Sequence, residues 1–439
     1  METLKFDLTR NDGCFKILNA TNGGPWHKRN TKNQLRSNIE DYKLARIPYS
    51  RNHDSFYNAV YGGPYSHDIT AIFPNFDADE NNPESYDFAC TDESILCTLD
   101  AGTKTFFRLG QSIEHHIKKH ATIPPKDFHK WARICEHIIR HYTEGWADGY
   151  TLDMPYWEIW NEPDLDLDAS IPYKRCWGGT SAQFFDFYEV AAKHLKSCFP
   201  HLKIGGPALA GVIEWAEEFL SEMQKRQVPI DFFSWHTYRT DVQDVILNTA
   251  QTIKNLLNKY GYTNAESILN EYNYVADWFE GFTQTILDIG GVKGMGFTMS
   301  VICEAQKTNL IDMLMYYDTR PGVFCGAFDL YTCKPRKPYY ALAWYGKFYD
   351  MEKYVKCDNE IEDVYTLCGV DKDGKSLSIV CYYKNEELEN KTIKLDFGKQ
   401  GAKYEIYAVD KDNNGELIKT TDDLTFDMPI NSMILVKEI

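Results

Sequence analysis

Two glutamates in this chain each follow an asparagine at the end of a short apolar run. Glu162 comes after residues 156–160 and Asn161, and Glu271 comes after residues 267–269 and Asn270. A carboxyl group at a strand tip can give or take a proton at the rim of a sheet. Two carboxyl groups roughly 5–5.5 Å apart can hydrolyse a glycosidic bond with retention of configuration. The alternative is that both are surface glutamates in loops.

Eight short apolar runs alternate with amphipathic stretches between about residues 14 and 350, and they predict eight strands. These candidate strands are residues 15–18, 44–48, 105–109, 156–160, 203–207, 231–235, 267–270 and 312–317. Eight is the number of strands that a closed parallel β/α barrel needs. Barrel enzymes carry their reactive groups at the C-terminal ends of the strands, so Glu162 and Glu271 would face each other across the mouth from the fourth and seventh strands.

The helices between these strands are recognised by apolar residues at helical spacing. One group follows the cap at Thr180-Ser181, a second follows Pro124-Pro125, and a third lies between residues 246 and 260. Serine and threonine are favoured as helix caps, and proline is favoured in a first helical turn. We interpret the apolar faces as surfaces packed on the barrel and not as binding features.

After about residue 350 the pattern changes to apolar alternation, which is typical of strands. The candidate strands are residues 377–381, 392–397, 404–409 and 433–436, with turn signals at Asp373-Gly374 and Asn414-Gly415. This predicts a small antiparallel β-sandwich over residues 351–439, behind a barrel over residues 13–350. Leu4, Phe6 and Leu8 also alternate, so we expect residues 1–12 to add a strand to the sandwich.

Composition narrows the possible partners and compartments. The formal net charge of the 439-residue chain is -17, which disfavours nucleic acid and anionic membranes as partners, although ordinary solubility is also a sufficient explanation. The sequence shows no basic region followed by an apolar run at its start, and no apolar run of about 18 residues. The twelve cysteines are scattered without zinc-finger spacing. We therefore expect reduced thiols in a cytoplasmic protein without a structural metal site.

The order of these motifs resembles the clan of retaining glycoside hydrolases built on the β/α barrel. Within that clan the chain is similar to glycoside hydrolase family 39, which holds β-xylosidases and α-L-iduronidases. The resemblance extends from about residue 14 to 350 and is carried by Arg51-Asn52-His53, residues 72–76, Tyr86-Asp87-Phe88, residues 107–110, Asn161-Glu162-Pro163, residues 205–208, residues 234–238 and Glu271.

The resemblance implies that Glu162 is the general acid/base and Glu271 is the nucleophile. It also implies that Asn161 donates a hydrogen bond to the 2-hydroxyl of the sugar, a contact that strengthens in the transition state. Arg51 would lie near Glu271 and keep it ionised, with a surface salt bridge as the alternative. No cofactor is implied, because acid/base and nucleophilic chemistry suffice.

Further residues are expected at the same site, each with a structural alternative. His53 and His236 would bind sugar hydroxyls, unless each is a buried histidine satisfied by core partners. Tyr238 would donate a hydrogen bond to the nucleophile, unless it is only packed. We interpret Trp157 and Trp160 as wall and core, and Glu158 as a buried structural carboxylate.

The expected substrate is a neutral sugar. No lysine or arginine stands among the residues directly after His236 except Arg239, whereas a uronic acid would need a cation for its carboxylate. The acidic residues 77–84 would also repel an anion. We expect an exo-acting β-xylosidase on short oligosaccharides. The alternatives are the same machinery on arabinosidic, glucosidic or uronidic linkages, transglycosylation, and a carbohydrate-binding barrel without catalysis. Exo or endo action and homo-oligomer formation stay open.

Overall fold

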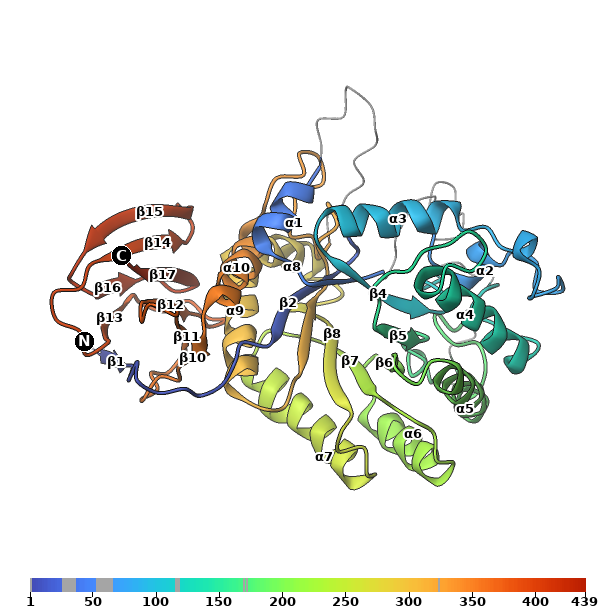
Figure 1. The fold of residues 1–439 in the computed structure, drawn as a ribbon. Helices are drawn as coiled ribbons and strands as arrows, with labels where there is room; N and C mark the ends of the chain where they lie inside the picture. The colour runs from blue at the N-terminus through green and yellow to red at the C-terminus, as the bar shows by residue number, and fades with distance from the viewer. Residues whose placement is uncertain are drawn as a thin grey trace.

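The computed structural model describes residues 2–25, 37–52, 66–114, 119–168, 170, 173–322 and 324–439. At its centre eight parallel strands close into a barrel in chain order, with helices around it (Figure 1). The barrel strands are β2 (Ile17–Asn22), β3 (Tyr49–Arg51), β4 (Lys104–Leu109), β5 (Tyr156–Ile159), β6 (Lys203–Leu209), β7 (Phe232–Arg239), β8 (Glu266–Tyr274) and β9 (Met313–Tyr316). The predicted β/α barrel is therefore confirmed.

The second strand does not lie where the sequence pattern predicts it. Residues 44–48 include the end of helix α1 (Ile39–Ala45), which closes at Arg46 with a left-handed φ of 51°. The strand follows as Tyr49–Arg51. The prediction was wrong because this strand is only three residues long and mostly polar, so it carries no apolar alternation. The shift makes Arg51 the last residue of the strand and not part of the loop after it.

The three predicted helices are confirmed as α4 (Phe128–Thr143), α5 (Ser181–Cys198) and α7 (Gln251–Lys259) with the π-helical segment before it (Asp244–Ala250), although Pro124-Pro125 lie before α4 and not in its first turn. The structure adds α2 (Ile69–Ile72), α3 (Ala89–Asp100), α6 (Ile213–Lys225), α8 (Phe282–Ile289), α9 (Val292–Lys307) and α10 (Lys337–Gly346). Thr180 and Gln183 cap α5 reciprocally. The start of α4 is fixed by Asp127, whose side chain accepts a hydrogen bond from the Lys130 amide at 3.0 Å. No single described helix is long and apolar enough to cross a bilayer, although α8 and α9, bent by 65° at their junction, would be so if taken together.

The barrel interior is filled in layers. Its lower layer is apolar and consists of buried side chains from Ala20, Tyr49, Phe106, Tyr156, Phe232, Ile268, Met313 and Met315. A much larger apolar cluster packs the helices against the outer face of the strands. The interior is therefore a packed core. The buried charged side chains of Arg51, Glu158 and Glu271 lie above this layer, toward the C-terminal ends of the strands.

The remaining strands form two sheets on one side of the barrel (Figure 1). One has the order β1-β13-β16, and the other has the order β10-β11-β12-β17-β14-β15. Their bounds are β1 (Glu2–Lys5), β10 (Lys353–Tyr354), β11 (Val364–Val370), β12 (Ser376–Tyr382), β13 (Lys391–Asp396), β14 (Tyr404–Val409), β15 (Asn414–Thr421), β16 (Thr425–Met428) and β17 (Ser432–Glu438). Apolar side chains from both sheets meet in one buried cluster, as a sandwich requires.

The N-terminal strand joins this sandwich, as its alternation predicts. β1 pairs with β13 and places Leu4 opposite Leu395. The pairing is parallel, so the smaller sheet is mixed and not purely antiparallel.

Of the two predicted turns in the sandwich, the one at Gly374 is confirmed. The one at Asn414-Gly415 is wrong in position, because Asn414 begins β15 and the turn lies just before it, held by the side chain of Asp410. The exact domain boundaries at residues 12 and 350 stay predictions.

Candidate active site

The barrel gathers six of the predicted site residues near the C-terminal ends of its strands. Arg51 ends β3, Asn161 and Glu162 follow β5, His236 and Tyr238 lie on β7, and Glu271 is paired with His236 from β8. An irregularity between Trp235 and His236 shifts the register of that strand pair. Such irregularities re-aim side chains, and here His236 comes to lie beside the nucleophile position.

The two glutamates converge on one point. Nδ1 of His236 lies 2.8 Å from Oε1 of Glu162 and 3.5 Å from Oε2 of Glu271. One side-chain oxygen of each glutamate and one ring nitrogen of His236 all lie within 4.8 Å of one another. This close approach fits the roughly 5–5.5 Å between carboxyl groups of retaining enzymes, and not the 6.5–9.5 Å of inverting enzymes. The predicted convergence of Glu162 and Glu271 is confirmed.

Arg51 is the charged centre beneath this pair. Its guanidinium donates to Oε2 of Glu158 at 2.6 Å and to Oε1 of Glu271 at 2.7 Å. A third bond reaches Oδ1 of Asn161 at 2.7 Å. Burial acts to lower the pKa of Arg51, but the charges of Glu158 and Glu271 outweigh it and hold that pKa above its ordinary value. The expected proximity of Arg51 to Glu271 is confirmed, and the surface salt bridge is excluded.

Glu158 is the buried structural carboxylate that the sequence predicts. Its side chain is fully buried and binds Arg51 on one oxygen and Nδ2 of Asn270 on the other, at 2.5 Å. A buried carboxylate needs such partners, because an unpaired charge in the interior is very costly. Asn270 therefore supports the site from below and does not touch the Glu271 carboxylate in any described contact.

Tyr238 and Asn161 complete the contacts around the two glutamates. The Tyr238 hydroxyl donates to Oε2 of Glu271 at 2.8 Å, which confirms the predicted contact between the two side chains. Burial and the negative charge of Glu271 raise the pKa of Tyr238, so the phenol keeps its proton and acts as a donor. Asn161 accepts from Arg51 through Oδ1, while its Nδ2 has no partner among the described residues. That amide is therefore available to a ligand.

His236 lies between the two carboxyl groups. Burial acts to lower the pKa of His236, but the charge of Glu271 and the hydrogen bond with Glu162 outweigh it, so the pKa is raised. Its Nε2 is buried without a partner among the described residues. The role of His236 in binding sugar hydroxyls stays a prediction. His53 lies outside the described residues. Trp157 and Trp160 are buried in the core, as expected.

The backbone of Glu162 is held in an unusual conformation. Its φ is 48°, in the left-handed region that costs an ordinary residue about 1–2 kcal/mol. The Glu162 amide donates to the carbonyl of Ala208 at 2.8 Å, beyond Gly206 on the adjacent strand. Gly206 has a φ of 140°, and a Cβ there would meet the carbonyl of Ile159 at 2.7 Å. The β6 tip can therefore approach the end of β5 and hold Glu162 in place.

Sequence reasoning missed two residues in the loop after Glu162. The carboxylate of Asp164 accepts backbone hydrogen bonds from Ala210 at 2.7 Å and from Gly211 and Val212 at 3.0 Å. Burial raises the pKa of Asp164 to about 6, with the charge of Glu162 acting in the same direction. The Cys176 thiol lies 3.9 Å from Oε2 of Glu162. Only the position of Asp164 directly after Asn161-Glu162-Pro163 could have indicated its role.

Aromatic residues border the site on the nucleophile side. The ring of Trp278 packs edge to face on Tyr238 with a centroid distance of 5.3 Å. Phe282 and Phe324 pack behind the indole. Trp278 is 47% exposed and its neighbour Phe279 is 86% exposed. Such amphipathic rings can pack on the apolar face of a sugar.

The same three side chains that converge could also ligate a metal ion. Glu162, His236 and Glu271 offer two carboxylates and an imidazole within ligand distance of one another. The Arg51 guanidinium at 2.7 Å from Glu271 opposes a cation there, and a histidine must be neutral to ligate. The arrangement is better suited to proton transfer between carboxyl groups than to metal binding.

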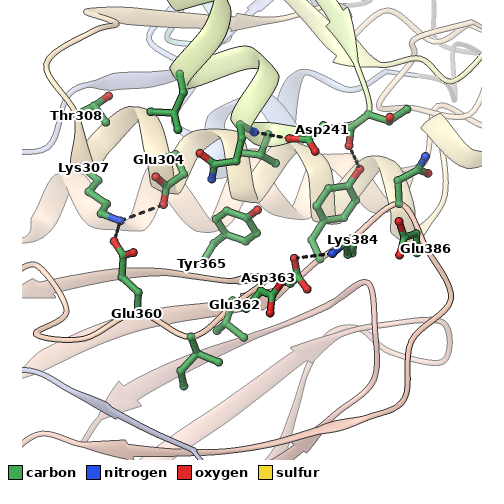
Figure 2. Close-up of a pocket in the computed structure, with 18 residues that line it drawn as sticks. Asp241, Glu304, Lys307, Thr308, Glu360, Glu362, Asp363, Tyr365, Lys384 and Glu386 are labelled. Carbon is green, nitrogen blue, oxygen red and sulfur yellow. Dashed lines mark hydrogen bonds and ion pairs between the residues drawn. The ribbon is translucent and has the colours of Figure 1, made fainter. Parts of the chain in front are cut away.

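Two other acidic features lie apart from the glutamate pair. A cavity of about 910 Å³ lies between the β7–α7 loop, the end of α9 and the sandwich, and none of the predicted site residues lines it (Figure 2). There Lys307 pairs with Glu304 and Glu360, and Lys384 pairs with Asp363.

The acidic residues 77–84 are partly neutralised by α4, because Lys130 and Arg133 bind Glu80. Their expected repulsion of anions is therefore weakened.

Comparisons with known proteins agree with this geometry. The family described as "Glycosyl hydrolases family 39" matches residues 27–284. β-Xylosidases of Caldicellulosiruptor saccharolyticus and Geobacillus stearothermophilus are 29% identical over 212 residues and 30% identical over 183 residues. These matches cover 46% and 39% of this chain, but only 40% and 34% of the relatives' own length.

Solved structures share the fold over the whole chain. A glucosidase from Croceicoccus marinus has a TM-score of 0.80 at 20% identity, covering 100% of this chain and 99% of its own. A β-xylosidase from Caulobacter crescentus has a TM-score of 0.68 at 14% identity, with the same coverage of 100% and 99%. These identities are too low to show more than the fold. The family match, in contrast, covers more than half of the chain, and this protein therefore belongs to glycoside hydrolase family 39, a retaining family.

Proposed function

We propose that this glycosidase is an exo-acting β-xylosidase that hydrolyses short oligosaccharides by double displacement. The observation that carries the proposal is the convergence of Glu162 and Glu271 around His236, with Arg51 paired to only one of the two. A buried cation and a phenol on Glu271 stabilise it as a carboxylate. Glu162 has no described arginine or lysine contact, so it can alternate between acid and base.

In the first step, Oε2 or Oε1 of Glu271 attacks the anomeric carbon while Glu162 donates its proton to the departing glycosidic oxygen. The glycosyl–enzyme ester then forms, and the leaving group departs as a neutral alcohol. In the second step Glu162, now a carboxylate, takes a proton from water, and the resulting hydroxyl oxygen attacks the anomeric carbon. Glu271 is released as a carboxylate and the sugar keeps its configuration.

The surrounding side chains assist these steps from fixed positions. Arg51 and Tyr238 stabilise the charge that returns to Glu271 when the ester is cleaved. Nδ2 of Asn161, unpaired among the described residues, would donate to the 2-hydroxyl of the sugar. His236 would hold Oε1 of Glu162 toward the reacting centre. These roles belong to the proposal and follow from the contacts of each side chain.

A neutral sugar is the proposed substrate because the described cations near the site are already engaged. Arg51 binds Glu158 and Glu271, and Arg320 binds Asp318 at 2.5 Å. Arg239 is exposed and donates to the carbonyl of its neighbour Tyr238 at 2.9 Å. A substrate carboxylate would need a cation of its own, since burying an unpaired charge is costly. β-Xylose is the choice that the two curated relatives support.

Activity assays on an aryl β-xyloside test this proposal. We expect Glu271→Ala to abolish turnover, because no nucleophile is left. Glu162→Ala should lose most activity on substrates with poor leaving groups and regain part of it with azide, which replaces the water that needs a base. Near wild-type rates in both variants would refute the assignment. Glu158→Gln is not a suitable control, since it breaks the buried pair with Arg51.

A panel of aryl glycosides separates the other linkages from xylose. Preference for an α-L-arabinoside, a β-glucoside or a uronide would change the proposed substrate but not the proposed roles of Glu162 and Glu271. Analysis of the products separates hydrolysis from transglycosylation and exo from endo action. A carbohydrate-binding barrel without catalysis is disfavoured, because the chain belongs to a hydrolase family and keeps both glutamates.

We also propose a cytoplasmic location. Nine of the twelve cysteines are free thiols, and reduced cysteines are typical of a reducing compartment. They are Cys14, Cys135, Cys176, Cys198, Cys303, Cys325, Cys357, Cys368 and Cys381. Fractionation of the source cells with an activity assay tests this proposal, and recovery of the activity outside the cells would contradict it. Assembly into a homo-oligomer stays a prediction that sedimentation of the purified chain can check.

A further inference from the structure

We propose that Glu136, His194 and Cys198 form a binding site for a divalent transition-metal ion such as zinc. The three side chains lie on α4 and α5, two helices that pack side by side on the outside of the barrel (Figure 1). One ligand atom of each, an oxygen, a nitrogen and a sulfur, lies within 4.8 Å of the other two. Among the described residues this is the one such cluster apart from the catalytic pair and His236.

The backbone brings the three ligands together by two separate means. His194 and Cys198 are four residues apart on α5, so their side chains project from the same face of the helix. Glu136 projects from α4 toward them and binds Nε2 of His194 through Oε2 at 2.7 Å. The Cys198 sulfur lies 3.9 Å from the same nitrogen. The ring nitrogen is thus shared by a carboxylate and a thiol.

These separations are close to those of tetrahedral zinc. With Zn–N of about 2.0 Å and Zn–S of about 2.3 Å, bound nitrogen and sulfur lie about 3.5 Å apart, and bound nitrogen and oxygen lie about 3.3 Å apart. The sulfur would therefore approach His194 by a few tenths of an ångström. The Glu136 oxygen would withdraw by a similar distance as the metal enters between it and the ring. Rotation of side chains achieves both changes.

Burial and charge also suit a dication. Glu136 is 16% exposed and His194 is 28% exposed, so water can supply the fourth ligand while the protein ligands stay ordered. Arg140 donates to Oε1 of Glu136 at 2.9 Å and so orients the carboxylate. Its positive charge opposes a metal ion, as that of Arg51 does in the other cluster, but here Glu144 pairs with the same guanidinium and offsets it. Glu136, Glu144 and a Cys198 thiolate carry three negative charges against one on Arg140, and the difference of two matches the charge of the metal.

Binding is a simple exchange of proton for metal. The S–H bond of Cys198 breaks, the sulfur bonds to the metal, and the proton passes to the buffer. His194 binds through the lone pair of Nε2 as a neutral imidazole, and no electron is transferred.

Nothing in the sequence indicates such a site, because Glu136 comes from a different helix and only the spacing of His194 and Cys198 is local. The site would join the two helices that flank β5, the strand that leads to Glu162.

Cobalt(II) is the probe for this site because its bond to a thiolate absorbs in the near ultraviolet and its tetrahedral complexes absorb in the visible. We expect the full-length protein, freed of metal with a chelator, to develop both absorptions up to one equivalent of cobalt. Zinc should then abolish them by displacement. One proton should be released per metal ion at a pH where His194 is neutral. Absence of the thiolate band, or a band without saturation at one equivalent, would overturn the site.

Three variants assign the ligands without relying on activity. Cys198→Ser and His194→Gln should lose the thiolate band or weaken cobalt binding at least tenfold, while their far-ultraviolet circular dichroism stays that of the wild type. Cys176→Ser is the matched control, because its thiol lies beside Glu162 in the other cluster, and it should keep the band. Zinc should raise the melting temperature of the wild type and of Cys176→Ser, but not of Cys198→Ser. An equal rise in all three proteins would overturn the assignment.

Discussion

The guanidinium of Arg51 donates to Oε1 of Glu271 at 2.7 Å, and both side chains are almost completely buried. The contact crosses the barrel mouth from the end of β3 to β8. Arg51 also binds Glu158, so two buried carboxylates share one cation. The expected nucleophile is therefore held in its charged form by a group that never meets bulk water.

Replacing Arg51 should destabilise the fold as well as the site. Arg51→Met leaves Glu158 and Glu271 buried without a counter-charge, and we expect the free energy of unfolding to fall by about 3–5 kcal/mol. Urea denaturation at neutral pH measures this. Arg46→Ala is the control, because Arg46 and Asp350 form an exposed pair at 2.7 Å and its loss should cost about 1 kcal/mol or less. Equal losses in the two variants would contradict the role of Arg51.

Removing the Tyr238 hydroxyl should slow the second chemical step most. The phenol donates to Oε2 of Glu271 and stabilises the carboxylate that leaves when the ester is cleaved. A hydrogen bond to a charged group contributes about 1.5–3 kcal/mol, so Tyr238→Phe should lower kcat by about tenfold to a hundredfold. With an activated aryl glycoside the variant should show a burst followed by slow turnover. Tyr407→Phe, which loses a hydroxyl bonded to Glu405 in the sandwich, should leave kcat unchanged.

The protonation of His236 should make stability depend on pH. Its pKa in the folded state is raised above the ordinary 6.5, because the charge of Glu271 and the bond with Glu162 outweigh burial. The contribution of the protonated ring to stability is therefore complete below the unfolded-state pKa and is lost as pH rises through the folded-state pKa. We expect the advantage in unfolding free energy of wild type over His236→Gln to shrink as the pH rises from about 6.5 through the raised folded-state pKa. An advantage that grows with pH would contradict this sign.

Loss of Asp164 should loosen the loop that carries Glu162. The Asp164 carboxylate accepts three backbone hydrogen bonds from the β6–α6 connection. Asp164→Ala removes all three bonds to these partly exposed donors, and at about 0.5–1.5 kcal/mol for each we expect a loss of about 2–4 kcal/mol in unfolding free energy. The kcat should fall too, as Glu162 loses its fixed position. Asp168→Ala removes an exposed carboxylate that accepts a hydrogen bond from the Ser170 amide at 2.8 Å, and it should be within about 0.5 kcal/mol of wild type.

Most of the barrel could be predicted from sequence because its strands are buried on both faces and read as apolar runs. The second strand could not, since Tyr49–Arg51 is short and polar and the preceding apolar residues belong to α1. The helices were readable from their spacing and from the Thr180 cap, which forms as the sequence predicts. The parallel pairing of β1 with β13 was not readable, because alternation predicts a strand but not its direction.

The site residues near strand ends could be predicted from the sequence, whereas the site residues in irregular loops could not. Glu162 lies three residues after the end of β5 and Glu271 lies three residues before the end of β8, so both are near the barrel mouth and barrel geometry predicts their meeting. Asp164 and Cys176 lie in an irregular loop, where no periodicity predicts which backbone or carboxylate they contact. The position of His236 between the glutamates depends on a register irregularity in β7 and β8 that has no sequence signal.

Trapping with a 2-deoxy-2-fluoro-β-xyloside that carries an activated leaving group tests the central claim most directly. The fluorine destabilises the positively charged transition states of both steps and so slows both. The activated leaving group makes the first step fast again, whereas the second step stays slow, so the glycosyl–enzyme accumulates. Peptide mass spectrometry should then find one fluoroxylosyl group, esterified to Glu271, and Glu271→Gln should carry none. A label on Glu162 or another residue, or continued turnover of ordinary xylosides by an enzyme that never takes up the label, would contradict the account.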